Sequence, residues 1–302
     1  MGLGCNNFGT KLDGAQTAAV VGTALDLGIN HFDTAEVYGQ GASEEYLGAA
    51  LGSRRDEAVI ATKYRWREPS GGYRPGELSE WIIRAAERSL RRLGTDRIDV
   101  YYQHAPDPQA PVEEMLEAFR SLFAAGKVRD FALANVDAGQ INEAAALAGE
   151  SEGFPLRAVQ VEWNLLSRGA EEHVVPAAHQ AGLGVVPYFP LASGVLTGKY
   201  NGRHGIPEGS RLAFMPEFAP LASEENLGKV ERLREVADRY GKSIIELSIG
   251  WLLAQADVPS VIAGATTPEQ VEVNAAAMGW VLGPVELEEV DTALGAGARS
   301  RT

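Results

Sequence analysis

Four side chains with acid–base chemistry follow apolar segments that are typical of buried strands. Asp33 and Tyr38 lie in the stretch HFDTAEVYG at residues 31–39. Lys63 ends the run VIATK, and His104 ends the run IDVYYQH. In a parallel barrel the catalytic groups come from the carboxyl ends of several different strands, which meet at one face. We therefore expect these four side chains to form a single site if the strands belong to such a barrel.

A site of this composition is suited to moving a proton to or from an oxygen that gains negative charge. A tyrosine hydroxyl has a pKa of about 10, so it is protonated at neutral pH but gives up its proton reluctantly. We expect the Lys63 ammonium to favour the phenolate and lower the pKa of Tyr38, with Asp33 holding Lys63 in place. A neutral His104 could orient the reacting oxygen. The set could protonate an alkoxide formed by hydride addition, and the hydride must come from a cofactor because no side chain supplies one.

Each of the four residues also has an ordinary structural interpretation. Asp33 could cap a turn, and Lys63 could be a solvated lysine at the rim of the fold. His104 could hydrogen-bond a loop, and Tyr38 could pack beneath one. The proton-transfer interpretation holds only if the strands converge, so the predicted fold decides between the two.

Short apolar runs alternate with longer amphipathic patterns along almost the whole chain. Strands are predicted at residues 3–5, 29–32, 58–62, 98–103, 130–134, 157–161, 184–188 and 260–263. Helices are predicted at residues 15–27, 43–51, 77–92, 112–125, 137–148, 170–181 and 243–255, and the longest irregular segment at about 194–224. Eight strand–helix alternations without a break in composition predict an α/β fold, a single-domain (β/α)8 TIM barrel over residues 1–302. No GxGxxG follows the first strand, which disfavours an open dinucleotide-binding sheet.

The composition restricts the possible partners. The 302 residues are 45% apolar and 23% charged, which is ordinary for a soluble protein with a sizeable core. The formal net charge of −14 argues against nucleic acid or an anionic membrane as a general partner. The chain has no uninterrupted apolar span long enough to cross a bilayer, and its one cysteine, Cys5, fits a reducing compartment. We expect a cytoplasmic protein.

The stretches that carry these residues resemble the aldo-keto reductase superfamily, most closely its bacterial oxidoreductases and potassium-channel β-subunit-like members. The matching stretches, in order, are GLGCNNFG (2–9), HFDTAEVYG (31–39), ATK (61–63), IDVYYQH (98–104), QVEWNLL (160–166), YFPLASGVLTGKY (188–200) and GATTPEQVEVN (264–274). The resemblance implies an NAD(P)(H)-dependent oxidoreductase that interconverts aldehydes or ketones and alcohols on a (β/α)8 barrel. It also implies that Asp33, Tyr38, Lys63 and His104 form the catalytic tetrad, with Tyr38 as the general acid.

The same resemblance implies which residues bind the nicotinamide cofactor. Asn135 and Gln160 match positions that hydrogen-bond the carboxamide, and Tyr188 matches the ring that stacks on the nicotinamide. The loop over the pyrophosphate is matched by Leu191, Ser193, Gly194 and Lys199. The residues that bind the adenosine end are matched by Gly264, Thr266, Gln270 and Asn274.

Three departures from the family pattern modify these expectations. Ala134 stands where a serine usually helps to hold the carboxamide, so looser nicotinamide binding is expected. Residues 264–270 contain no basic side chain for the 2′-phosphate of NADP(H), and Glu269 adds a negative charge. NADP(H) is therefore the family default, with NAD(H) as a serious alternative. The chain also begins at the first predicted strand, so the usual amino-terminal hairpin is expected to be absent.

Aromatic and polar residues beside the tetrad predict a pocket for a small carbonyl or alcohol substrate: Asn7, Phe8, Trp66, Trp163 and Phe189. Two functions of other classes remain open. One is a regulatory protein that senses the redox state of the nicotinamide with little turnover. The other is a barrel lyase in which Lys63 forms a Schiff base. A metal-dependent hydrolase is disfavoured because no His-x-His pair offers a metal site.

Overall fold

The computed structural model describes residues 1–65, 73–106, 111–149, 154–200, 210–280 and 282–295. Its eight strands form a closed barrel in which each strand pairs in parallel with the next and β8 closes on β1. The strands are β1 (Gly2–Gly4), β2 (His31–Asp33), β3 (Val59–Tyr64), β4 (Ile98–Gln103), β5 (Val128–Ala134), β6 (Leu156–Glu162), β7 (Gly184–Tyr188) and β8 (Ile262–Gly264). The predicted (β/α)8 barrel is confirmed.

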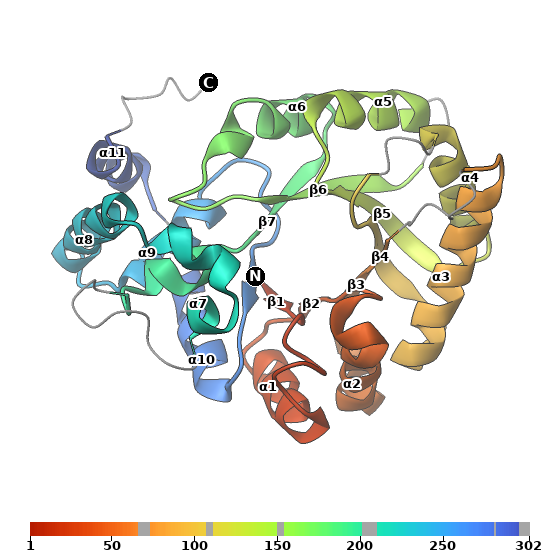
Figure 1. Cartoon of the computed structure of the whole chain (residues 1–302), viewed down its shortest axis with the longest axis horizontal. Coiled ribbons are helices and arrows are strands. Elements are labelled where there is room, and N and C mark those ends of the chain that lie inside the picture. Colours follow the sequence, from red (N-terminus) through yellow and green to blue (C-terminus); the bar gives the residue numbers. More distant parts are fainter. Residues whose placement is uncertain (66–72, 107–110, 150–153, 201–209, 281, 296–302) are drawn as a thin grey trace.

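The helices surround the strands (Figure 1). In the described part of the chain they are α1 (Gly14–Asp26), α2 (Ala42–Leu51), α3 (Glu77–Leu93), α4 (Val112–Ala124), α5 (Ala138–Gly149), α6 (Val174–Gln180), α7 (Arg211–Phe214), α8 (Glu224–Arg239), α9 (Ile244–Leu253), α10 (Pro268–Ala276) and α11 (Pro284–Ala293). The predicted helix ranges correspond to α1 to α6 and α9, and they do not include α7, α8, α10 or α11. The sixth predicted range is 170–181, whereas a separate 3₁₀ turn at Gly169–Glu171 precedes α6.

Local capping interactions explain where several of these helices begin. The Asp13 side chain accepts a hydrogen bond from the main-chain N–H of Gln16, whose own side chain accepts one from the main chain of Asp13. Ser243 and Glu246 form the same reciprocal pair at the start of α9. Such capping boxes satisfy two of the N–H groups that the first turn of a helix leaves without a partner. They therefore set the lengths of the loops that lead from β1 to α1 and into α9.

The inside of the barrel is packed mainly with small apolar side chains, whereas the outer faces of the strands pack on the helices. The inner cluster consists of Ala61, Tyr102, Ala132, Ala134, Ala158, Val186 and Ile262. Small residues at these positions leave room inside the barrel for longer polar side chains. Lys63, which β3 carries one residue beyond the predicted end of that strand, is fully buried there.

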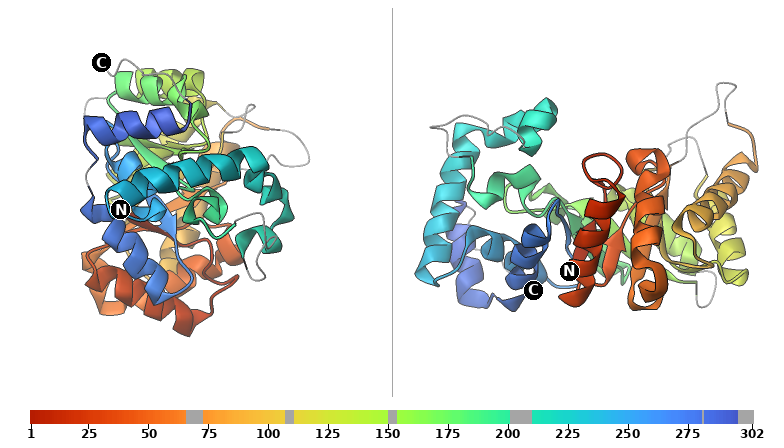
Figure 2. Two further views of the ribbon diagram at one scale, coloured as in Figure 1. Left: turned by 90° about the vertical axis from the view of Figure 1, so that its left-hand side faces the viewer. Right: turned by 90° about the horizontal axis from the view of Figure 1, so that it is seen from below.

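The segment predicted to be irregular at about 194–224 contains ordered turns in its described part. A 3₁₀ turn at Ala192–Thr197 follows β7, and α7 and a second 3₁₀ segment at Pro216–Ala222 lead into α8. In the right-hand view of Figure 2, α7 lies at the end of the barrel away from the amino terminus. Within the described residues, no helix is both long and apolar enough to span a membrane.

Candidate active site

A buried ion pair lies at the carboxyl end of β2 and β3. The Lys63 Nζ donates to Asp33 Oδ1 at 2.6 Å and to the main-chain oxygen of Thr34 at 2.8 Å. Gln160, on β6, donates from Nε2 to the second carboxylate oxygen, Oδ2, of Asp33 at 2.8 Å. Both oxygens of Asp33 therefore have a donor, as a buried carboxylate requires. The pair is a fixed charged unit and not a solvated rim lysine beside a turn cap.

Tyr38 and His104 lie next to this pair. The Lys63 Nζ is 5.3 Å from the centroid of the Tyr38 ring, and the ring of His104 meets that of Tyr38 edge to face with centroids 5.7 Å apart. Asp33 ends β2 and Lys63 lies in β3, whereas His104 directly follows β4 and Tyr38 lies in the 3₁₀ turn after β2. Their convergence is what the strand assignment predicted.

The pKa of Tyr38 differs from the sequence-based expectation. Burial raises the pKa of Tyr38, and the opposing charge of Lys63 only reduces this increase, with Asp33 acting against it. Lys63 does lower the pKa of Tyr38, as expected, but its effect is smaller than the increase that burial causes. For Lys63, burial works against the charged form, but Asp33 and Tyr38 outweigh it, so the Lys63 pKa is raised. Tyr38 is therefore a protonated donor and Lys63 a permanent cation at neutral pH.

The His104 imidazole is also uncharged at neutral pH. Burial, together with the nearby charge of Lys63, lowers the pKa of His104 to about 4. Its Nδ1 is buried and has no hydrogen-bond partner among the described residues. A neutral imidazole can donate from one nitrogen and accept at the other, so His104 can hydrogen-bond an oxygen in the cavity.

Two partly buried histidines predict how the stability of the fold depends on pH. Burial lowers the pKa of His31 to about 4, as it does that of His104, against about 6.5 in the unfolded chain. The unfolded state then binds more protons, so stability falls as the pH drops from 6.5 towards 4. We expect each histidine to contribute about 2 kcal/mol to the loss between pH 7 and pH 5.

The variant His31→Asn tests this contribution because asparagine can keep the contact of His31 Nδ1 with Ser260 Oγ, which is 2.9 Å long. Urea unfolding of the wild type and the variant at both pH values would measure the difference. The variant should lose less stability than the wild type by about 2 kcal/mol. Equal losses would show that His31 titrates normally in the folded protein.

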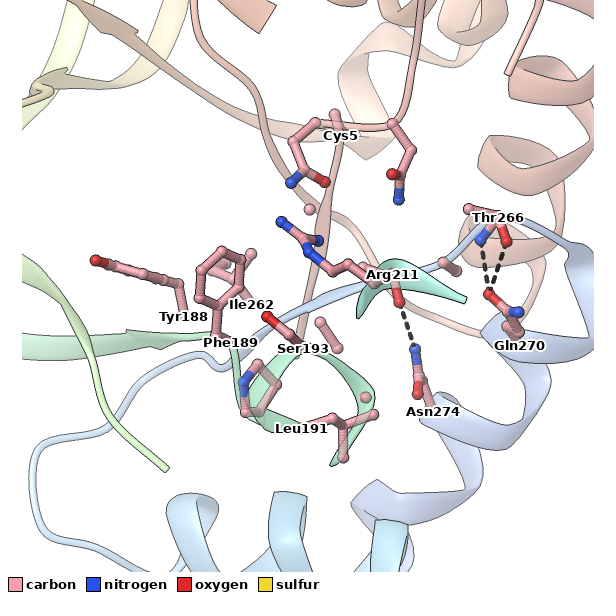
Figure 3. Close-up of a pocket in the computed structure, with 18 of the residues that line it drawn as sticks. Cys5, Tyr188, Phe189, Leu191, Ser193, Arg211, Ile262, Thr266, Gln270 and Asn274 are labelled. Atoms are coloured by element: carbon pink, nitrogen blue, oxygen red, sulfur yellow. Dashed lines mark hydrogen bonds between the residues drawn. The ribbon is translucent and has the colours of Figure 1, made fainter. Parts of the chain in front are cut away.

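A cavity of about 720 Å³ opens at the carboxyl ends of the strands (Figure 3). Asp33, Tyr38 and His104 line it, whereas Lys63 lies behind them and does not. All of the residues matched to a cofactor also line it: Asn135, Gln160, Tyr188, Leu191, Ser193, Gly194, Lys199, Gly264, Thr266, Gln270 and Asn274. The cavity thus extends from the predicted proton donor to the predicted adenosine end.

Three cations on the cavity wall form no ion pair within the described part of the chain: Lys11, Lys199 and Arg211. Each lies over an aromatic ring instead. The Lys11 Nζ is 4.6 Å from the centroid of Phe214, and the Arg211 guanidinium is 4.6 Å from that of Phe189. Burial and the charges of Arg211 and Lys199 lower the pKa of Lys11, so the three cations repel one another. An anion in the cavity would relieve this repulsion.

The turn after β7 also has the features of an anion site. Ser193 has a φ of 55°, unusual for a residue with a side chain, and its Oγ is buried with no hydrogen-bond partner among the residues that the structure describes. A Cβ on Gly194 would lie 3.0 Å from the Lys199 Nζ, so glycine keeps this turn open to the lysine. The Arg211 Nε is likewise buried without a partner in the described structure. Strained backbone and free polar groups in one place are typical of a ligand site.

The opposite end of the cavity is formed by the start of α10. Gln270 Oε1 accepts hydrogen bonds from the main-chain N–H of Thr266 at 2.8 Å and from its Oγ1 at 3.1 Å. The Asn274 Nδ2 donates to the main-chain oxygen of Gly264 at 3.3 Å. In Figure 3 the Arg211 side chain lies between Phe189 and this end of the cavity. Arg211 thus places a cation between the two ends of the cavity.

Only some of the residues predicted to contact the substrate line the cavity. Asn7 and Phe189 line the cavity. Phe8 is fully buried in the core beneath α1 and α2, and Trp163 is 2% exposed and packs on Trp251, so neither lines the cavity and both predictions are corrected. Trp66 lies outside the described residues.

Sequence reasoning missed Lys11 and Arg211. Lys11 follows the GLGCNNFG stretch, and Arg211 lies in the long segment predicted to be irregular. Only their position above the cavity distinguishes them from surface cations. Within the described part of the chain, no group of three or more histidine, cysteine, aspartate or glutamate side chains is placed to hold a metal ion.

Comparison with known proteins identifies the family of this chain. A model of the Aldo/keto reductase family matches residues 1–294. A probable voltage-gated potassium channel subunit beta from Arabidopsis thaliana is 35% identical over 94% of this chain and 89% of its own. Aldo-keto reductase YhdN from Bacillus subtilis is 35% identical over 90% of this chain and 81% of its own. L-glyceraldehyde 3-phosphate reductase from Escherichia coli O157:H7 is 31% identical over 95% of this chain and 86% of its own. Because the family model spans residues 1–294 and these relatives match at least 90% of the chain, this chain belongs to the aldo/keto reductase family.

Proposed function

We propose that this chain interconverts small aldehydes or ketones and the corresponding alcohols, with Tyr38 as the general acid and base. The aldo/keto reductases, to which it belongs, are oxidoreductases that depend on a nicotinamide cofactor. The observation that carries the proposal is the contact of Tyr38 with the buried Asp33–Lys63 pair on one side and with His104 on the other, at the wall of a cavity that also carries cations.

The cavity suits a nicotinamide dinucleotide, which when bound supplies or accepts the hydride. Tyr188 and Gln160 would hold the nicotinamide end next to Tyr38. Ser193, Gly194, Lys199 and Arg211 would bind the pyrophosphate, because their free donors and unpaired charges suit a dianion. Thr266, Gln270 and Asn274 would hold the adenosine. The free polar atoms of Ser193 and Arg211 are the structural reason to assign an anionic ligand here.

The tetrad of Asp33, Tyr38, Lys63 and His104 would transfer the proton to or from the substrate oxygen. Tyr38 remains protonated at neutral pH and points at the same cavity as His104. As negative charge develops on the substrate oxygen, the Lys63 cation stabilises the phenolate that Tyr38 becomes on donating its proton. Neutral His104 would hydrogen-bond the same oxygen and fix its orientation. The reverse reaction would use the same groups in the opposite sense.

Between the two cofactors, we infer a preference for NADP(H). Residues 264–270 offer no basic side chain, and Glu269 lines the cavity. The cavity wall nevertheless carries Lys11, Lys199 and Arg211, none of which forms an ion pair in the described structure. Three cations without an ion pair favour the dinucleotide with the additional phosphate. NAD(H) remains the alternative because none of the three lies on the loop where the 2′-phosphate is expected.

Binding and single-turnover experiments test the function. Quenching of intrinsic fluorescence by NADPH and NADH in the same buffer would give both dissociation constants. Mixing the complex with an aromatic aldehyde would then give the rate of hydride transfer from the loss of nicotinamide absorbance. We expect binding of both, tighter for NADPH, and measurable transfer. Binding of neither would overturn the assignment, and tighter binding of NADH would overturn the inferred preference.

Arg211→Ala is expected to weaken binding of both dinucleotides about 10- to 100-fold, because it removes charge-assisted hydrogen bonds to the pyrophosphate. The dissociation constants of the variant and of Arg84→Ala would be measured by the same quenching assay. Arg84 is an exposed α3 residue that pairs with Glu80, so its removal should leave binding unchanged. Unchanged affinity in Arg211→Ala would show that Arg211 lies outside the nucleotide site.

A second candidate function is a sensor of the nicotinamide redox state with little turnover. It is favoured by the relatives named as potassium channel β subunits in Arabidopsis thaliana and Schizosaccharomyces pombe. A sensor would bind dinucleotide tightly but release it so slowly that steady-state turnover is far below the single-turnover rate. The Schiff-base alternative fits the geometry poorly, because Lys63 is buried, charged and away from the cavity wall.

A further inference from the structure

A chain of hydrogen bonds connects three strand ends at the mouth of the barrel. The Tyr188 hydroxyl, at the end of β7, donates to Asn135 Oδ1 at 2.8 Å. Asn135, just after β5, donates from Nδ2 to the main-chain oxygen of His104 at 2.8 Å. We propose that Tyr188 is a positioning residue for His104: acting through Asn135, its hydroxyl holds the main chain of His104 so that the imidazole faces the substrate oxygen beside Tyr38. The proposal rests on the proposed function and gives a second role to a residue assigned only to stack on the nicotinamide.

The two hydrogen bonds determine each other's direction. A side-chain amide has its acceptor on one side and its donors on the other. Because Asn135 Oδ1 accepts from Tyr188, Nδ2 faces the carbonyl of His104, which can only accept. Burial raises the pKa of Tyr188 to about 12, so its hydroxyl remains a donor throughout the neutral range.

The backbone of Asn135 holds the amide in this position. Its φ is 58°, in the left-handed region where asparagine is one of the few side chains tolerated. Its main-chain N–H donates to the main-chain oxygen of Gln160 at 3.0 Å, which ties it to β6. Asn135 is therefore a fixed bridge between β7 and the end of β4.

His104 depends on its main chain because its ring has few anchors. The imidazole Nδ1 has no partner among the described residues, so no side-chain hydrogen bond at that nitrogen orients the ring. The main-chain N–H of His104 donates to the oxygen of Tyr64 at 3.0 Å, and its carbonyl accepts from Asn135. Loss of the second contact would leave the residue held to β3 alone, and errors of about 1 Å in the position of a catalytic group can cost about 10²-fold in rate.

Tyr188→Phe tests the proposal because it removes one oxygen and keeps the stacking ring. We expect the single-turnover rate to fall about tenfold, the value of one hydrogen bond, while the dissociation constant of NADPH stays within about twofold. In the nucleotide-free protein, amide hydrogen exchange at His104 and Ala105 should be faster. Asn135→Gly, which tolerates the positive φ, should have the same effect on exchange, and the double variant should lose no more rate than Asn135→Gly alone. Tyr46→Phe, on α2 and away from the cavity wall, is the matched control and should change nothing.

The opposite results are equally specific. If Tyr188→Phe weakens NADPH binding by the same factor by which it lowers the single-turnover rate, and amide hydrogen exchange is unchanged, the hydroxyl acts on the nucleotide and the proposal is wrong. Independent, multiplicative losses in the double variant would contradict it as well. Because hydrogen exchange needs no nucleotide, failure of the wild-type protein to bind or oxidise NADPH would overturn the proposed function and leave this measurement interpretable.

Discussion

Replacing Tyr38 with phenylalanine is expected to reduce single-turnover hydride transfer to an aldehyde by about 10²- to 10⁴-fold, the usual contribution of a general acid. The phenylalanine keeps the ring that packs against His104 and lies 5.3 Å from the Lys63 Nζ, and it loses only the proton donor. The dissociation constant of NADPH should stay near its wild-type value. A loss of this kind, confined to the chemical step, identifies an interaction made in the transition state.

Two comparisons make this experiment decisive. Tyr102→Phe removes the hydroxyl of a second tyrosine inside the barrel, whose ring centroid lies 5.8 Å from the same Lys63 Nζ. Because Tyr102 does not line the cavity, this variant should change the rate of hydride transfer little. The pH dependence of the wild-type rate should show no ionisation of Tyr38 near neutrality, because burial raises its pKa. A Tyr38→Phe protein that reduces the aldehyde at close to the wild-type rate would exclude Tyr38 as the proton donor.

The sequence predicted the strand ends better than the residues between them. Asp33, Tyr38 and His104 were placed together because each follows an apolar run, and the periodicity of buried strands is a strong local signal. Phe8 and Trp163 were misplaced for the same reason. Both lie beside functional residues in the chain, but a change of direction within one or two residues sends them into the core.

Other features depend on contacts that no local pattern encodes. The increase in the Tyr38 pKa follows from how deeply the ring is buried, which the sequence does not give. Arg211 enters the cavity from a short helix in a segment rich in Gly and Pro, and only packing against Phe189 reveals its position. The hydrogen bond of Gln160 to Asp33 joins residues 127 positions apart.

The missed helix α8 shows a different limit. It is mostly charged, and its buried side is narrow: Val230, Leu233, Val236 and Ala237. These positions do follow the helical period, and Ser223 caps the first turn, so the signal was present but weak beside so many charged residues. Because the stretch before α8 is rich in Gly and Pro, the sequence predicted an irregular segment there and no helix after it.

Lys63→Met is expected to abolish turnover and also to destabilise the fold by about 3–5 kcal/mol, because it leaves the Asp33 carboxylate buried without its cation. Lys63 has no exposed surface and Asp33 is 4% exposed, so water cannot replace the missing charge. The double variant Asp33→Asn/Lys63→Met removes both charges and should regain most of the lost stability, since a buried ion pair is often no more stabilising than a neutral replacement. It should nevertheless remain inactive, because the cation that stabilises the Tyr38 phenolate is gone.

Urea unfolding of the single and double variants separates these two roles of Lys63. Arg84→Met breaks an exposed pair with Glu80 and serves as the control, with an expected loss below about 1 kcal/mol. If the double variant were as unstable as Lys63→Met, the loss would come from packing and not from an unpaired charge. If the double variant were stable and active, neither residue would belong to the catalytic group. Recovery of stability without recovery of turnover is the outcome expected of an ion pair that the fold tolerates because the reaction needs it.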